Sequence, residues 1–218
     1  AEEYMTNPKQ VLLNEEEISL DTIAQSYLIT QERQKFKHLC ELIKNESKKQ
    51  MIVFAATKQR THRLANDLKD AGFKAISIHG DLSQKQREVA MYRFKTARED
   101  ILVATDIAAR GIDIPAVSHV VNYDVPEDPL IYFHRIGRTA RAGGTGKAVS
   151  LVSVERVDDF QRIINRTEQP IRKLNFELGI EVPVYEGRNN RPSFSRGRSF
   201  RPSNGYRDRR ENQYGQRK

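Results

Sequence analysis

Three arginines recur at intervals of three residues in one stretch of the sequence: Arg135, Arg138 and Arg141. On a helix this spacing would bring like charges together on adjoining turns and cost roughly 0.2–0.5 kcal/mol per pair. Residues 129–154 contain no Asp or Glu, so the local sequence offers no counter-ion for these arginines or for Lys147. Guanidinium groups bind phosphate oxygens in a bidentate manner and stay charged at physiological pH, so the stretch predicts a polyphosphate ligand. The alternative is a solvated basic helix face that pairs with distant carboxylates.

Two further segments combine polar groups that suit a phosphorylated ligand. In residues 104–115, Asp113 stands beside Gly111 and is predicted to accept sugar hydroxyl groups, unless it only caps a turn or a helix. In residues 79–87, a strand exit is followed by a helix start, whose free amide groups and dipole favour an anion. The alternative is that Ser83, in that segment, is only a helix N-cap.

The elements that position these segments follow from hydrophobic periodicity. Short apolar runs typical of buried strands alternate with helical patterns of about 10–15 residues, which indicates βαβ units and a mainly parallel sheet. We therefore predict one three-layer α/β domain over residues 26–178. The expected strands are residues 26–30, 51–55, 74–79, 101–104, 117–123 and 147–152, and the expected helices are residues 31–45, 61–71, 84–97, 129–141 and 158–166.

Polar groups directly follow three of the expected strands, at Thr57, residues 79–81 and residues 105–106. Ligands of such sheets bind beyond the carboxyl ends of the strands, so we expect these exits to form a site. Residues 1–25 include the acidic run Glu15-Glu16-Glu17 and are expected to be an interdomain linker or a segment packed on the outside of the domain.

The net charge of +8 belongs to the C-terminal tail. Residues 187–218 contain ten basic and two acidic residues, whereas residues 1–186 contain 27 of each. We expect residues 179–218 to form a disordered, Arg-rich tail. Its arginines alternate with aromatic residues, a composition that suits single-stranded RNA and predicts binding that weakens steeply with salt. The alternative is a solubilising tail without a specific partner.

Several classes of protein are disfavoured by the sequence. No window approaches 18 consecutive apolar residues and no signal-peptide pattern is present, so we expect no membrane association. The single cysteine, Cys40, and five scattered histidines predict neither a disulfide nor a metal site, and a cytoplasmic location fits best. Because the first residue is not Met, we expect a chain cut from a longer one, although initiator processing gives the same appearance.

Taken in order, the motifs resemble those of the second RecA-like domain of DEAD-box RNA helicases, from about Ser26 to Leu174. The resemblance implies a RecA-like fold, with ATP and RNA bound across a cleft between two such domains. Closure of the cleft would bend one strand of a short duplex, and hydrolysis would release it. The matching segments are residues 52–54 with Thr57, residues 79–81 with Gln84 and Arg87, and residues 104–115, 123–126 and 134–143.

The resemblance also implies roles for individual residues at the nucleotide. Arg138 and Arg141 match arginines that contact the γ-phosphate of ATP, one of them as an arginine finger, and together with His134 they are implied to be catalytic. Asp113, beside Gly111, matches the carboxylate that contacts the ATP ribose. The positions implied to couple this domain to the first one are Arg110 and His134.

At the RNA, the resemblance implies contacts with the sugar-phosphate backbone, which position the strand without reading its sequence. The implied positions are Thr57, Gly80, Gln84, Arg87 and Thr105. The sequence departs from the family at Ala140, where the family usually has glycine, and this departure puts the placement of Arg141 in question.

The chain contains neither a Gly-x-x-x-x-Gly-Lys-Ser/Thr loop nor an Asp-Glu-Ala-Asp run. The resemblance therefore implies that ATP and Mg²⁺ are held mainly by an N-terminal RecA-like domain of the same protein, with RNA as substrate and protein cofactors as a further possibility. We expect this chain to be the C-terminal half of a helicase and to be inactive alone as an ATPase. The alternatives are a non-catalytic RNA-binding or scaffolding module and a homodimer formed through residues beyond 150.

Overall fold

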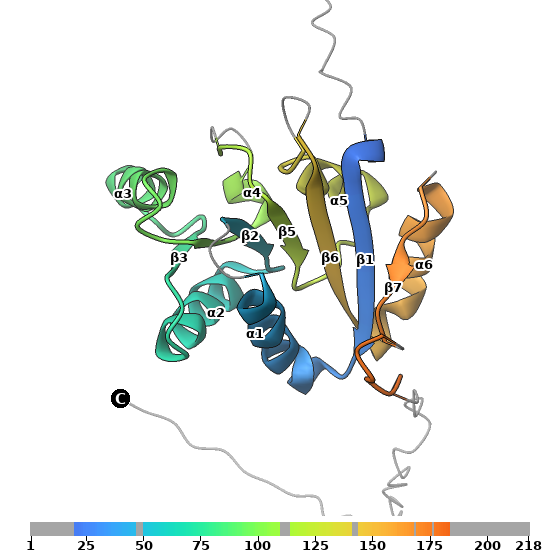
Figure 1. Ribbon diagram of the computed structural model, residues 1–218. Coiled ribbons are helices and arrows are strands. Elements are labelled where there is room, and N and C mark those ends of the chain that lie inside the picture. Colours follow the sequence, from blue (N-terminus) through green and yellow to red (C-terminus); the bar gives the residue numbers. More distant parts are fainter. Residues whose placement is uncertain are drawn as a thin grey trace, which may run out of the picture. The chain divides into compact units, whose positions relative to one another are not determined.

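The computed structural model describes residues 20–46, 50–109, 114–140, 144–167, 169–175 and 177–183. Seven parallel strands form one sheet in the order β3-β4-β2-β5-β6-β1-β7 (Figure 1). The strands are β1 (Ile23–Thr30), β2 (Met51–Phe54), β3 (Ala75–Ile78), β4 (Ile101–Ala104), β5 (His119–Asn122), β6 (Gly146–Ser153) and β7 (Arg172–Lys173). The helices are α1 (Lys35–Asn45), α2 (Lys58–Asp70), α3 (Gln84–Lys95), α4 (Asp106–Ala109), α5 (Pro129–Ile136) and α6 (Val157–Arg166).

Helices cover both faces of the sheet because alternate residues of each buried strand point to opposite sides. In β2, Met51 and Val53 pack in a core with α1 and α2. Ile52 and Phe54 pack on the other face with α3 and α4. On that same face, α5 and α6 cover the outer strands β1 and β6. This arrangement confirms the expected three-layer α/β domain with a parallel sheet.

The helices begin where the sequence provides capping groups. The Thr57 hydroxyl accepts the Arg60 amide at the start of α2, and Ser83 forms a reciprocal capping box with Gln86 at the start of α3. Asp128 caps α5, whose first residue is Pro129. Ser83 is thus a helix N-cap, which was the alternative to an anion-binding role for residues 79–87.

The structure differs from the expected elements in one place that matters for function. The helix predicted over residues 129–141 ends at Ile136, where Gly137 is the C-cap, and the chain then turns through Arg138. Gly137 donates its amide to the Phe133 carbonyl at 2.9 Å, which closes the last turn of α5. Arg135 and Arg138 therefore do not lie on adjoining turns of one helix. The repulsion expected for like charges on adjoining helical turns does not apply to this pair.

In the described part of the chain, one short α-helix and one short strand were not expected from the sequence. They are α4, which has four residues, and β7, which has two. No helix in the described part of the chain is both long and apolar enough to cross a membrane.

Candidate functional site

Polar residues that follow the central strands lie along one edge of the sheet. The register pairs Phe54 with both Ala104 and Asn122, and Ala104 with Ile78, so β2, β3, β4 and β5 end side by side. The chain order places β4 and β5 on opposite sides of β2, and such a switch in strand order is where sheets of this kind bind ligands. The three polar strand exits therefore lie at one edge of the sheet, and the expectation that they form a binding site stays a prediction.

The residues expected to contact RNA surround the exits of β2, β3 and β4. Gly80 and Gln84 are exposed, and the Gln84 amide donates to Glu88 at 3.1 Å on the same helix. Arg87 is half-buried, and its Nε has no hydrogen-bond partner among the described residues. Thr57 is exposed, whereas Thr105 is buried and its hydroxyl accepts the Ala108 amide at 3.4 Å. Four of the five positions are thus at least partly open to a ligand. Thr105 is not, because its backbone amide donates to the Ile78 carbonyl and its backbone carbonyl accepts from the Ala109 amide.

Arg135 joins three strand exits inside the domain. Its side chain is buried, with 3% exposure, and forms a bidentate ion pair with Asp106, from Nε to Oδ1 at 2.6 Å and from Nη2 to Oδ2 at 2.9 Å. Its Nη1 donates to the Asn122 side chain at 3.1 Å and to the Asp124 carbonyl at 2.6 Å. The guanidinium carbon also lies 5.0 Å from the centre of the Phe54 ring. Every terminal nitrogen of Arg135 is therefore engaged within the domain.

These contacts correct two expectations about counter-ions. Arg135 has a partner in Asp106, which lies 29 residues away in the sequence, so it is not available to a triphosphate. Lys147 likewise forms an ion pair with Glu46. The alternative interpretation is thus right about pairing with distant carboxylates for both residues, but Arg135 is buried and does not lie on a solvated helix face.

Arg138 and His134 line a small hollow of about 20 Å³ beside this ion pair, together with Phe54, Asp106, Ala109 and Ile131. His134 is exposed and Arg138 is half-buried. The backbone of Arg138 is held on both sides, since its amide donates to Arg135 at 3.0 Å and its carbonyl accepts from Val117 at 3.1 Å. The turn therefore fixes the backbone position from which the Arg138 side chain extends, next to the exits of β2 and β4.

The turn is clamped by close packing at Gly146. Thr139 is fully buried and its hydroxyl donates to the Val117 carbonyl at 2.5 Å. A Cβ at Gly146 would lie 2.2 Å from the Thr139 hydroxyl oxygen, closer than side chains approach one another. Gly146 therefore allows β6 to run against the turn that carries Arg138.

Ala140 has a left-handed backbone conformation, with φ of 55°. A non-glycine residue in this region crowds its Cβ against the backbone, which gives a physical reason for glycine at this position in the family. We predict that Ala140→Gly raises the free energy of unfolding by about 0.5–1 kcal/mol, because the relief of crowding exceeds the extra chain entropy of glycine.

Urea unfolding followed by circular dichroism measures this change. Ala97→Gly is the matched control, because Ala97 has φ of 53° and lies beyond the end of α3. Similar stabilisation is expected there. A destabilised Ala140→Gly protein beside a stabilised Ala97→Gly protein would contradict the prediction.

A second group of charges lies where β5 ends. Asp124 accepts the Ala56 amide at 2.9 Å and pairs with Arg60 at 2.8 Å and with the buried Lys35 at 3.5 Å. Burial raises the pKa of the neighbouring Tyr123 to about 12, with Arg60 opposing the change, so its phenol stays protonated at neutral pH. These residues line an open hollow of about 1030 Å³ that also includes Thr57. Lys35 and Arg60 have carboxylate partners within the domain, so they serve to hold this edge together.

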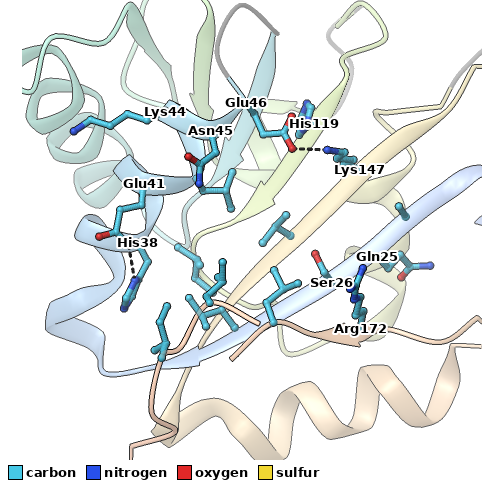
Figure 2. Close-up of a pocket in the computed structure, with 18 of the residues that line it drawn as sticks. Gln25, Ser26, His38, Glu41, Lys44, Asn45, Glu46, His119, Lys147 and Arg172 are labelled. Carbon is cyan, nitrogen blue, oxygen red and sulfur yellow. Dashed lines mark hydrogen bonds and ion pairs between the residues drawn. The ribbon is translucent and has the colours of Figure 1, made fainter. Parts of the chain in front are cut away.

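A separate hollow of about 750 Å³ lies near the opposite end of the strands, between α1, β1, β6 and the segment after β7 (Figure 2). Its floor is apolar, and Glu46 at its rim pairs with both Lys147 and His119. At the other side of the rim, His38 lies 3.2 Å from Glu41. Among the expected site residues that the structure describes, none lines this hollow.

Four expected site residues lie outside the described part of the chain: Arg110, Gly111, Asp113 and Arg141. Within that part, no three His, Cys, Asp or Glu side chains are grouped to hold a metal ion. Sequence reasoning missed Asp106 and Asn122 as partners of Arg135. A carboxylate directly after a buried strand was the available signal for Asp106.

Comparison with known proteins identifies the class of this domain. Residues 34–143 match the family model of the helicase conserved C-terminal domain. The DEAD-box ATP-dependent RNA helicase CshA of Bacillus licheniformis is 44% identical over 174 residues, which are 80% of this chain and 36% of CshA. The chain therefore belongs to the helicase C-terminal domain family, within the DEAD-box RNA helicases. It spans about a third of the length of such relatives.

Solved structures agree with this assignment. Escherichia coli SrmB, a DEAD-box protein bound to the regulator of ribonuclease activity A, has 41% identity and a TM-score of 0.66, over 69% of this chain and 89% of that one. Saccharomyces cerevisiae Dbp5, bound to RNA and ADP BeF₃, has 34% identity and a TM-score of 0.67, over 73% of this chain and 44% of that one. The RecA-like fold expected from the motifs is confirmed.

Proposed function

We propose that this chain is the C-terminal half of an ATP-dependent RNA helicase that remodels or unwinds short RNA duplexes. The observation that carries the proposal is the placement of two kinds of group at one sheet edge. The backbone-binding positions around Thr57, Gly80 and Arg87 lie at the exits of β2 and β3, and the turn with Arg138 lies beside the exits of β2 and β4. RNA and nucleotide would thus contact neighbouring parts of one rigid edge.

The donors at the hollow beside Arg135 suit a triphosphate. His134 and Arg138 provide nitrogen donors there. Among the described residues that line the hollow, Asp106 is the one carboxylate, and both of its oxygens already accept from Arg135. When bound, ATP with Mg²⁺ would supply the phosphoryl group, and the N-terminal RecA-like domain would make most of the contacts with the nucleotide. Arg138 would stabilise the charge that develops on the γ-phosphate, together with Arg141. His134 and Arg110 would couple this edge to the N-terminal domain, and Asp113, beside Gly111, would bind the ribose.

The remaining assignments complete the proposal. The expected bounds change at both ends, because β1 begins at the buried Ile23 and because Ile180 packs against the core. The helicase domain expected over residues 26–178 would therefore extend from Ile23 to at least Ile180. The linker proposed over residues 1–25 would end before β1. The RNA-binding tail proposed over residues 179–218, most of which lies outside the described residues, would begin after Ile180. Dbp5 was solved with RNA and ADP BeF₃, and SrmB with a protein regulator. These relatives support RNA and ATP as ligands, and they support protein cofactors as further partners.

The RNA site is tested by Arg87→Ala. If Arg87 contacts a backbone phosphate, its loss should weaken binding of any single-stranded RNA about equally and lower the slope of log affinity against log salt by about one. Fluorescence anisotropy with labelled oligouridine and a mixed-sequence RNA, each over a range of salt, measures both quantities.

The matched control is Lys69→Ala, because Lys69 is an exposed cation in the last turn of α2, away from the strand exits. This substitution removes the same charge from the chain but should leave the slope nearly unchanged. Equal effects of the two substitutions would mean that only net charge matters, and the site at Gly80 and Arg87 would be rejected.

A further inference from the structure

His79 is a buried polar side chain whose hydrogen-bonding groups are unused. It is the first residue after β3, and 6% of it is exposed. Neither ring nitrogen has a hydrogen-bond partner among the described residues. Buried polar groups are nearly always paired, and an unpaired one in a native fold calls for a reason. A packing role alone does not supply that reason, since an apolar side chain would fill the space without unpaired nitrogens.

Charged and titratable groups surround this ring from each neighbouring element. Helix α2 contributes Lys58 and also His62, whose ring meets His79 edge-on with 5.7 Å between centroids. The loop after β3 contributes Asp81, which pairs with Lys58 at 2.7 Å. Helix α3 contributes Arg87. At the end of β4, Thr105 donates its amide to the Ile78 carbonyl at 3.4 Å and brings no titratable group.

The balance of these groups keeps His79 neutral in the free domain. Burial lowers its pKa below the usual value of 6.5, and His62, Lys58 and Arg87 act in the same direction, while Asp81 opposes them. One added negative charge nearby would reverse this balance, because it would offset the cations that disfavour a protonated ring. The backbone-binding positions Gly80 and Arg87 are where an RNA phosphate would bring that charge.

We propose that His79 takes up a proton when an RNA phosphate binds at Gly80 and Arg87, and that the buried imidazolium then helps to hold the RNA backbone. This inference rests on the proposed RNA-binding function. His79 is a positioning residue here, because its ring nitrogens are buried and it would act on the phosphate through charge and not through contact. The neutral ring is the form present without RNA, and the charged ring stabilises the state with an RNA phosphate bound at Gly80 and Arg87.

The coupling makes RNA affinity depend on pH in a defined direction. RNA raises the pKa of His79, so affinity increases as the pH falls from the pKa of the RNA-bound state toward that of the free state, and it levels off below both. If the pKa of His79 is about one unit higher with RNA bound, affinity at the low-pH limit exceeds affinity at the high-pH limit about tenfold. The arginines of the tail remain charged throughout this range, so they add affinity without adding pH dependence.

The direct test is a nuclear magnetic resonance titration of the histidine side chains in the full 218-residue chain, without RNA and with saturating oligouridine. We expect the pKa of His79 to rise by about one unit when RNA binds. His38 lies on α1 and serves as an internal reference that should not move. The backbone amide signals of Gly80 and Arg87 report separately whether RNA occupies the site.

The matched substitutions are His79→Gln and His38→Gln, with RNA affinity measured by anisotropy between pH 6 and 8. The glutamine at position 79 cannot take up a proton, so the rise in affinity toward low pH should largely disappear, whereas His38→Gln should retain it. If RNA shifts the Gly80 and Arg87 signals but leaves the His79 titration unchanged, the proton coupling is overturned and the RNA site stands. If RNA shifts none of them, the proposed RNA site itself fails. The histidine titration uses the unsubstituted chain, so it decides the question even if His79→Gln does not fold.

Discussion

Arg135→Ala is expected to lower the free energy of unfolding by about 3–5 kcal/mol, because it removes the buried member of an ion pair and leaves the partly buried Asp106 carboxylate and two further acceptors without their donor. Asp106 would lose both of its bonds to Arg135, and Asn122 and the Asp124 carbonyl would each lose a donor. The planar side chain would also leave a void against Phe54, which lies 5.0 Å away. The lost contacts all lie at the ends of β2, β4 and β5. This edge of the sheet, which carries the candidate site, should therefore be destabilised most.

Urea unfolding followed by circular dichroism measures the change, and Arg162→Ala is the matched control. Arg162 is 66% exposed and pairs with Asp159 at 3.3 Å on the surface of α6, so its loss should cost less than about 1 kcal/mol. Arg135→Lys should recover only part of the stability, because an ammonium group cannot form the bidentate pair. A loss below about 1 kcal/mol in Arg135→Ala would show that the ion pair does not support the fold.

The fold could be predicted because local patterns and tertiary structure agree in most of the chain. The apolar run of β2 is buried on both faces, and Thr57 and Ser83 cap helices that begin close to where the periodicity places them. The early end of α5 was harder to predict. Gly137 is a weak stop signal, and the apolar spacing up to Ile136 gives no sign that the chain turns directly after it.

The partners of Arg135 could not be predicted from its neighbours, since they come from other strand exits. Asp106 and Asn122 approach Arg135 only because β4, β2 and β5 lie side by side. A sheet order of this kind depends on long-range pairing that local sequence does not encode. The charge of residues 129–154 therefore indicated an anionic partner correctly for Arg135, but not that the partner was a carboxylate of the same domain.

Arg138 differs from Arg135 in position, and this difference sets the largest expected effect on activity. Arg138 lies in the turn after α5, half-buried at the rim of the hollow with His134, whereas Arg135 points into the sheet edge. In the full-length protein, Arg138→Ala should lower RNA-stimulated ATP hydrolysis by about 10³–10⁵-fold, the range for loss of an arginine finger. RNA affinity should change little, because none of the positions proposed to contact RNA lies in the turn that carries Arg138. Arg141→Ala is expected to act in the same direction.

Phosphate release with and without RNA measures hydrolysis, and anisotropy measures RNA affinity in the same preparations. Arg138→Lys retains the charge but not the bidentate geometry, so it should remain strongly impaired. Arg162→Ala, on the exposed face of α6, should hydrolyse ATP at the unsubstituted rate. The isolated 218-residue chain should release no phosphate on its own. If Arg138→Ala loses less than about tenfold in hydrolysis while its stability is unchanged, Arg138 does not contact the reacting phosphate, since such contacts are worth far more. The nucleotide would then have to be stabilised by Arg141 or by the N-terminal domain.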